Sequence, residues 1–124
     1  MREIKFRGKR IDNGEWVQGY FLVAAGMPFI SAFGERSPIL VIPETVGQYT
    51  GLKDKHGKEI YEGDIVLYGD EKGVVIYHEC EFSLKIKGEE YIQHGLLVEK
   101  SFRPFEVIGN IYENPELFGE SYEN

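Results

Sequence analysis

The residues that could support nucleophilic or metal chemistry are few, and the best-placed pair is His78 and Cys80. Two residues apart on a strand, their side chains would point to the same face and offer an imidazole and a thiol there. The Cβ atoms of such a pair lie about 6–7 Å apart, which is too far for direct proton transfer from the nucleophile to the base. His56 and His94 add no spacing known from zinc sites. We therefore expect no catalytic residue, no metal site and no cofactor.

The acidic pairs and the glycine-lysine step also favour structural roles. Asp70-Glu71 and Glu89-Glu90 lie in charge-rich stretches typical of solvated turns, not of a buried acid–base pair. Gly51 and the Gly57-Lys58 step are one residue too far apart for a phosphate-binding loop. Glu59 also replaces the hydroxyl residue that such a loop uses to hold Mg²⁺. These residues predict a protein that is not an enzyme.

Length, charge and cysteine content restrict the remaining function classes. The chain has 124 residues, 42% of them hydrophobic, which is enough for one compact domain. Lys and Arg number 14 against 21 Asp and Glu, and the net charge of −7 disfavours general binding of nucleic acid. The single cysteine, the lack of a signal-peptide core and the absence of ~20 consecutive apolar residues predict a cytoplasmic protein that does not enter a membrane.

Short stretches of alternating apolar and polar residues, separated by glycine-rich turns, predict a mostly β fold. Asn13-Gly14 predicts a tight turn between the first two strands. Asn114 and Pro115 predict the cap and first residue of a short C-terminal helix, which Gly119 ends. The strands are expected at residues 3–7, 15–23, 29–33, 39–42, 46–52, 65–68, 74–78, 83–86, 91–93 and 105–112.

The Gly63-Asp64 step indicates how these strands are assembled. A Gly-Asp pair followed by apolar residues opens a strand in many small SH3-like barrels, since glycine allows a bend and aspartate binds backbone N–H groups. We expect either a small SH3-like β-barrel, with an N-terminal β-hairpin extension and a short C-terminal helix, or two short packed sheets. The single domain would divide into a hairpin and loop-rich part (1–44), a barrel-like core (45–114) and a short helix and tail (115–124).

Motifs at the start, middle and end of the chain resemble the YopX family, small proteins carried by bacteriophages and prophages. The central motif covers 43–54 (PETVGQYTGLKD) and 57–66 (GKEIYEGDIV). The opening 2–8 (REIKFRG), the step 14–17 (GEWV) and the closing 108–117 (IGNIYENPEL) also match, in the same order. The resemblance implies an all-β fold with an SH3-like element, and it implies no activity and no catalytic residues.

The preferred hypothesis is a non-enzymatic binding module for a host or phage macromolecule in the bacterial cytoplasm. The stretch 49–64 is dense in glycine, tyrosine and charged turn residues. An equally weighted alternative is that its glycines only allow the chain to turn. Tyrosines and exposed strand edges also fit a homo-oligomer without requiring one. The candidate partner-binding residues are Tyr49, Lys58, Tyr61, Glu62 and Asp64.

The alternative hypothesis is nucleic-acid binding by the basic N-terminal strand. The first ten residues carry five basic side chains and one acidic one, a net charge of +4, which leaves −11 on the other 114 residues. Basic residues near Trp16 and Tyr20 would resemble a groove for single-stranded nucleic acid. Basic residues also protect an edge strand from aggregation, and the net charge favours that explanation. The candidate nucleic-acid-binding residues are Arg2, Lys5, Arg7, Lys9 and Arg10.

Overall fold

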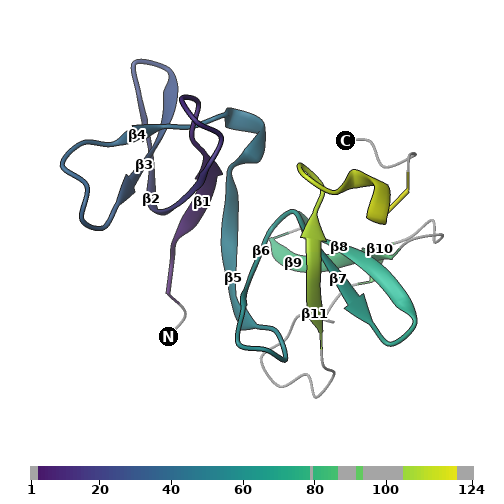
Figure 1. Ribbon diagram of the computed structural model, residues 1–124. Helices are drawn as coiled ribbons and strands as arrows, with labels where there is room; N and C mark the ends of the chain where they lie inside the picture. Colours follow the sequence, from purple (N-terminus) through teal and green to yellow (C-terminus); the bar gives the residue numbers. More distant parts are fainter. Residues whose placement is uncertain (1–2, 79, 87–91, 94–104, 120–124) are drawn as a thin grey trace. The chain divides into compact units, whose positions relative to one another are not determined.

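The computed structural model describes residues 3–78, 80–86, 92–93 and 105–119. The chain forms two compact units, Met1–Tyr49 and Thr50–Asn124, coloured from purple to blue and from teal to yellow in Figure 1. Strand β5 (Gly47–Lys53) belongs to both, because the boundary falls within it.

The first unit is an antiparallel sheet in which a long hairpin is paired with shorter strands. Its strand order is β4-β3-β2-β1-β5. A single 3₁₀ turn precedes β5, and Arg10 forms an isolated bridge with Val41. The elements are β1 (Phe6–Lys9), β2 (Trp16–Ala24), β3 (Met27–Ala32), β4 (Ile39–Leu40) and η1 (Pro43–Thr45).

Alternation along these strands builds a small apolar core. Ile30, Ile39 and Val41 are buried, and Phe6 and Val17 pack against them. The side chains that alternate with Phe6 along β1 are basic, so the two faces of this strand differ in chemistry. The predicted alternation is therefore confirmed for the first strand, whereas the outer half of β2 is exposed on both faces at Tyr20, Phe21 and Val23.

Two turns connect the first three strands. At the predicted turn after β1, the N–H of Gly14 donates to the carbonyl of Arg10 (2.9 Å), and the N–H of Arg10 donates to the carbonyl of Glu15 (2.8 Å). Between β2 and β3 the two turn residues, Ala25 and Gly26, have φ of 53° and 76°. Positive φ at both positions defines a type I′ turn, whose twist matches that of the flanking strands.

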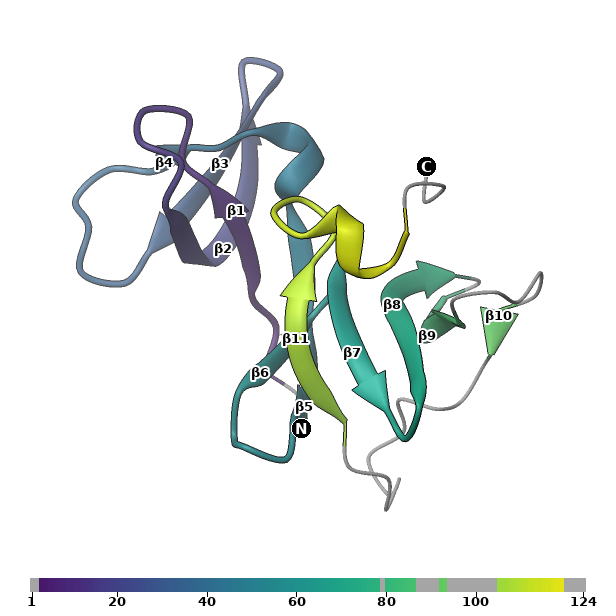
Figure 2. The same cartoon turned by 45° about the vertical axis from the view of Figure 1, so that its right-hand side comes forward.

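The second unit contains a five-stranded antiparallel sheet in the order β10-β9-β8-β7-β11. Figure 2 shows β11, β7 and β8 side by side. A short strand, β6, pairs with the part of β5 that lies in this unit. The elements are β6 (Glu59–Tyr61), β7 (Asp64–Tyr68), β8 (Glu71–His78), β9 (Glu81–Ile86), β10 (Ile92–Gln93), β11 (Glu106–Asn110) and the 3₁₀ turn η2 (Pro115–Leu117).

Both faces of this sheet are covered. Val66 and Val75 belong to one buried cluster, which Phe105 completes. Their neighbours Ile65 and Val74 belong to a second cluster on the opposite face. Burial on both faces explains why β7 is a continuous apolar run rather than an alternating one.

The Gly63-Asp64 step bends the chain into β7, as predicted. Gly63 has φ of +94°, and a Cβ at this position would lie 2.8 Å from Cε2 of Tyr112. The carboxylate of Asp64 accepts a hydrogen bond from the N–H of Tyr61 (2.7 Å). The Tyr61 hydroxyl in turn donates to Glu59 (3.1 Å). These contacts make the step a buried corner.

The mostly β fold is confirmed, whereas the SH3-like barrel and the C-terminal helix are not. Over the described residues, the strands form two open antiparallel sheets. After Asn114 the chain makes only one 3₁₀ turn, and the side chain of Asn114 accepts from the N–H of Asn110 (3.3 Å) instead of capping this turn. The turn ends at Leu117, and Gly119, with φ of 112°, follows its C-terminal cap Phe118.

Candidate interaction surfaces

Three of the five residues predicted to bind a partner lie in the interior. Tyr61 and Asp64 are each 1% exposed, and they are held together by the Tyr61 N–H to Asp64 bond. Tyr49 is also buried and belongs to the first unit. Of the set, Lys58 is exposed and Glu62 is half-buried. Of these five residues, a partner could therefore reach only Lys58 and, in part, Glu62.

The turn after β5 is organised by Asp54, a residue that the sequence did not single out. One carboxylate oxygen accepts from the N–H groups of His56 (2.8 Å) and Lys58 (2.9 Å), and the other accepts from the N–H of Val107 (3.0 Å). Burial alone would raise the pKa of Asp54, but the three backbone donors outweigh it and hold the pKa below its ordinary value. The carboxylate thus ties the turn to β11, which is a structural role.

The basic side chains of the first strand lie over aromatic rings. The guanidinium of Arg7 is 4.5 Å from the ring centroid of Trp16, and the amine of Lys9 is 5.7 Å from the same centroid. The amine of Lys5 is 5.2 Å from the ring centroid of Tyr49. The predicted grouping is therefore present at Trp16, whereas the ring beside Lys5 is Tyr49 and not the expected Tyr20. The cations cover ring faces that a nucleic-acid base would need for stacking.

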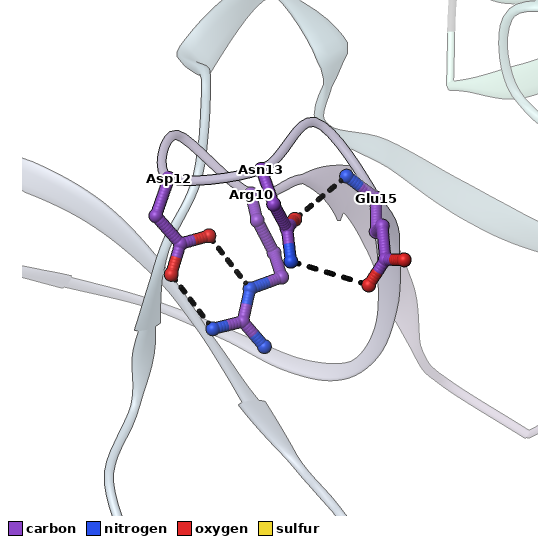
Figure 3. Close-up of polar contacts among 4 residues, drawn as sticks. All are labelled: Arg10, Asp12, Asn13 and Glu15. Atoms are coloured by element: carbon purple, nitrogen blue, oxygen red, sulfur yellow. Dashed lines mark hydrogen bonds and ion pairs between the residues drawn. The ribbon is translucent and has the colours of Figure 1, made fainter.

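The last basic residue of the strand is engaged within its own turn. Nε and Nη2 of Arg10 donate to the two carboxylate oxygens of Asp12 (2.9 and 2.8 Å), as Figure 3 shows. This paired hydrogen bond raises the pKa of Arg10 and lowers the pKa of Asp12. Beside it, the side chain of Asn13 accepts from the N–H of Glu15 (2.9 Å) and donates to its carboxylate (3.2 Å). Arg2 lies outside the described residues.

The histidine–cysteine pair does not lie along one strand. Strand β8 ends at His78, and Cys80 occupies the turn that follows, exposed and with φ of 67°. Among the residues that the structure describes, no group of three or more His, Cys, Asp or Glu side chains is placed to hold a metal ion. The described part of the chain also contains no helix long and apolar enough to cross a membrane.

Large apolar side chains are exposed along the β2–β3 hairpin and beside it. Phe33 is fully exposed, Tyr20 is 72% exposed and Val23 is 61% exposed. Ile4 and Met27 are also exposed. Tyr20 and Met27 lie on one face of the hairpin and Val23 on the other, because side chains alternate along its strands. We call these five residues, which occupy both faces, the hairpin surface. Several large exposed apolar side chains on one hairpin make it a candidate interaction site.

The strands of the hairpin carry no charge, and they border a hollow that Glu3 and Lys5 also line. No residue from 16 to 34 carries a charge. Tyr20, Phe33 and Ile4 border a hollow of about 420 Å³, which is also lined by Glu3, Lys5, Gln18, Gly19, Ser31 and Ala32. A side chain at Gly19 would overlap the backbone oxygen of Ser31, so the close approach of β2 and β3 at this point requires glycine.

Comparison with known proteins assigns the family. A family model described as "YopX protein" matches residues 5–119, nearly the whole chain. The chain belongs to the YopX family. This assignment confirms the resemblance indicated by the sequence motifs. Among curated proteins, no significant match was found.

The fold of this YopX protein is also found in a solved structure. It is similar to the crystal structure of protein EF1440 from Enterococcus faecalis, with a TM-score of 0.57 and 23% sequence identity. The likeness covers 95% of this chain and 99% of that one. At this level of identity it shows a shared fold.

Sequence reasoning missed the hairpin surface of this YopX protein. The alternation over 15–23 places Tyr20 and Val23 on opposite faces, but it does not reveal that both are exposed. The motifs that identify the family also drew attention to 43–66. The signal that could have located the surface is the long uncharged stretch from 16 to 34.

Proposed function

We propose that this YopX protein is a non-enzymatic accessory protein of a bacteriophage or prophage, which acts in the bacterial cytoplasm by binding a host or phage protein. The observation that carries this proposal is the hairpin surface, with its exposed Tyr20, Val23 and Phe33. Burying one large apolar side chain contributes roughly 1.5–3 kcal/mol, so a few such contacts supply most of the energy of a specific complex.

The chemistry of this surface fits a protein better than a nucleic acid. The hairpin residues 16–34 carry no charge, whereas affinity for nucleic acid depends mainly on cations that contact phosphates. Cations of the N-terminal segment are engaged by the protein itself: Lys5 lies 3.6 Å from Glu3, and Arg10 is paired with Asp12. The nucleic-acid alternative therefore has weaker support.

The proposed site is the hairpin surface, and it replaces the surface centred on 49–64. Within that stretch Lys58 stays useful as a probe, because it is exposed and lies in the second unit. A homo-oligomer that uses the hairpin surface is a separate outcome, which a mass measurement in solution distinguishes from a complex with another protein.

Affinity capture from lysate of the bacterial host tests the proposal. The bait is the tagged full chain, either wild type or with Phe33→Ser or Tyr20→Ser. The matched control is Tyr77→Ser, because Tyr77 is also an exposed aromatic side chain, 51% accessible, but lies in the second unit. Lys58→Glu tests the surface predicted from the sequence.

We expect a specific host or phage protein to be recovered with wild type, Tyr77→Ser and Lys58→Glu, and to be reduced at least tenfold with Phe33→Ser. A tenfold loss corresponds to about 1.4 kcal/mol, less than the burial of one phenylalanine contributes. Equal recovery with all five baits would contradict the proposal. Loss with Lys58→Glu alone would return the site to the 49–64 stretch.

A further inference from the structure

The outer half of β2 has an edge that is unpaired over the described residues. Strand β1 pairs with β2 from Lys9↔Trp16 to Phe6↔Gly19 and begins at Phe6. Strand β3 pairs with β2 over its outer half, up to Ala24. Residues 20–24 of β2 therefore have a strand on one side only, in the part of the chain that the structure describes.

The type I′ turn determines which backbone groups face this edge. In a two-residue hairpin the residues that flank the turn, here Ala24 and Met27, form a hydrogen-bonded pair. Such pairs alternate along the strands, so Leu22 and Tyr20 also bond to β3. The N–H and C=O groups of Phe21 and Val23 consequently point to the other side, beyond the end of β1.

The bonds made by neighbouring residues agree with this alternation. The carbonyl of Glu15, which like Phe21 and Val23 has an odd number, accepts from Arg10 on the β1 side of the hairpin. On β3, the carbonyl of Pro28 points away from β2 and accepts from Val41. The hollow of about 420 Å³ lies at the point where β1 ends and this edge begins.

We propose that this YopX protein binds an extended, uncharged segment of its protein partner as an added strand along the outer edge of β2. The inference rests on the proposed function and specifies how the partner is bound. The backbone groups of Phe21 and Val23 would form the hydrogen bonds, and apolar side chains of the segment would contact Tyr20 and Phe33.

Charge and interface size favour an extended protein segment over a lipid bilayer or a second copy of this chain. A bilayer would cover the apolar side chains but leave the backbone groups of Phe21 and Val23 without hydrogen bonds, which is costly in hydrocarbon. A second copy of this chain carries −7, and a five-residue edge about 17 Å long buries far less than the roughly 1,200 Å² typical of a stable dimer. A short segment needs no interface larger than this edge. An uncharged segment has no charged group that would lose its hydration on contact with residues 16–34.

A matched pair of substitutions separates the backbone contact from the side-chain contact. Val23→Pro removes the outward N–H of Val23, and an edge strand tolerates proline where this group faces solvent. Val23→Thr keeps the N–H and the branched shape but makes the side chain polar. The probes are eight-residue peptides of alternating valine and threonine, one uncharged, one with glutamate replacing threonine and one with alternate amides N-methylated.

Hydrogen exchange of the full chain at millimolar peptide is the measurement. The uncharged peptide is expected to slow exchange at Phe21 and Val23 without changing Tyr20 and Leu22, which already bond to β3. Binding is expected to be about tenfold weaker for the glutamate peptide and the N-methylated peptide than for the uncharged peptide. The Val23→Pro variant should bind the uncharged peptide about tenfold more weakly than wild type does. A tenfold loss is the equivalent of one or two hydrogen bonds. Val23→Thr should weaken binding less than Val23→Pro.

Several results would overturn the inference. They are unchanged exchange at Phe21 and Val23 with every peptide, equal affinity of the N-methylated peptide, or a dimer of the full chain formed through this edge. If the captured partner is lost with Phe33→Ser but binds Val23→Pro as wild type, the proposed function stands and strand addition is excluded. If neither variant affects the partner, both proposals fail.

Discussion

Asp54 is the residue whose chemistry is most clearly linked to stability. Its carboxylate accepts three backbone N–H bonds, and its pKa is lowered by them. A carboxyl group with a lower pKa in the folded state stabilises the fold above its unfolded pKa of about 3.9. This contribution is lost as the pH falls through the folded pKa.

We expect Asp54→Asn to lower the free energy of unfolding by about 1–3 kcal/mol at neutral pH, because the amide cannot accept from Val107 while it serves the other two donors. The difference between wild type and variant should shrink below about pH 4. Urea denaturation as a function of pH measures both effects. Asp70→Asn, in an exposed turn, removes the same charge as a control. A difference that persists unchanged at acid pH would contradict this role of the carboxylate.

Gly63 and Gly57 provide a second test at single residues. Both have positive φ, but a Cβ at Gly63 would lie 2.8 Å from Tyr112, whereas a Cβ at Gly57 meets no atom within 4 Å. Gly57→Ala should cost about 1 kcal/mol of conformational strain, and Gly63→Ala about 1–3 kcal/mol more. Denaturant midpoints of the two variants measure the difference. Equal costs would show that Tyr112 does not restrict this corner.

At the scale of elements, the β2–β3 turn contains one residue, Ala25, in a strained backbone conformation. Ala25 has φ of 53°, and alanine pays roughly 1 kcal/mol or more in this conformation, which asparagine tolerates better. Ala25→Asn should therefore stabilise the protein by about 0.5–1 kcal/mol. Thermal or denaturant unfolding measures the gain.

The neighbouring position supplies the control for this prediction. Ala24 is also exposed but lies in strand β2, so Ala24→Asn should not stabilise and should lower stability slightly. A loss of stability in Ala25→Asn, or equal gains in both variants, would contradict the type I′ turn on which the orientation of Phe21 and Val23 depends.

The elements also show how far the sequence predicts the fold. Alternation and turn residues locate most strands, because burial of one face and positive φ leave direct signals such as Asn13-Gly14. The Gly63-Asp64 corner is predicted for the same reason. Closure into a barrel is not predictable in this way, since it depends on pairing between distant strands. The hydrogen bond from the N–H of Val107 to Asp54 is also not predictable, because the two residues are 53 positions apart in the chain.

For the candidate site the sequence is a poorer guide. Tyr61 and Asp64 look like surface residues within a motif rich in glycine and charge, yet both are buried by neighbours that no local pattern reveals. Val23 is a different case, because alternation separates it from Tyr20 onto the opposite face of β2, yet both side chains are exposed. The exposure of a side chain depends on where the neighbouring strands end. Strand pairing determines those ends, and the local sequence does not show them.

At the scale of the whole molecule, charge separates the two candidate functions. The chain carries −7 overall, and the cations of its basic strand lie over Trp16 and Tyr49 or beside carboxylates. We expect no binding of a fluorescent single-stranded DNA oligonucleotide at micromolar protein and low salt, as measured by anisotropy. Binding that weakens steeply with salt and is lost in Lys9→Glu would favour the nucleic-acid alternative.

Photo-crosslinking in host cells tests most directly whether the hairpin surface binds a protein. p-Benzoylphenylalanine is placed at Phe33, at Val23 or, as the matched aromatic control, at Tyr77. We expect one discrete crosslinked adduct of the same partner from positions 33 and 23, and none from position 77. The absence of an adduct from position 33, or the same adducts from positions 33 and 77, would contradict it.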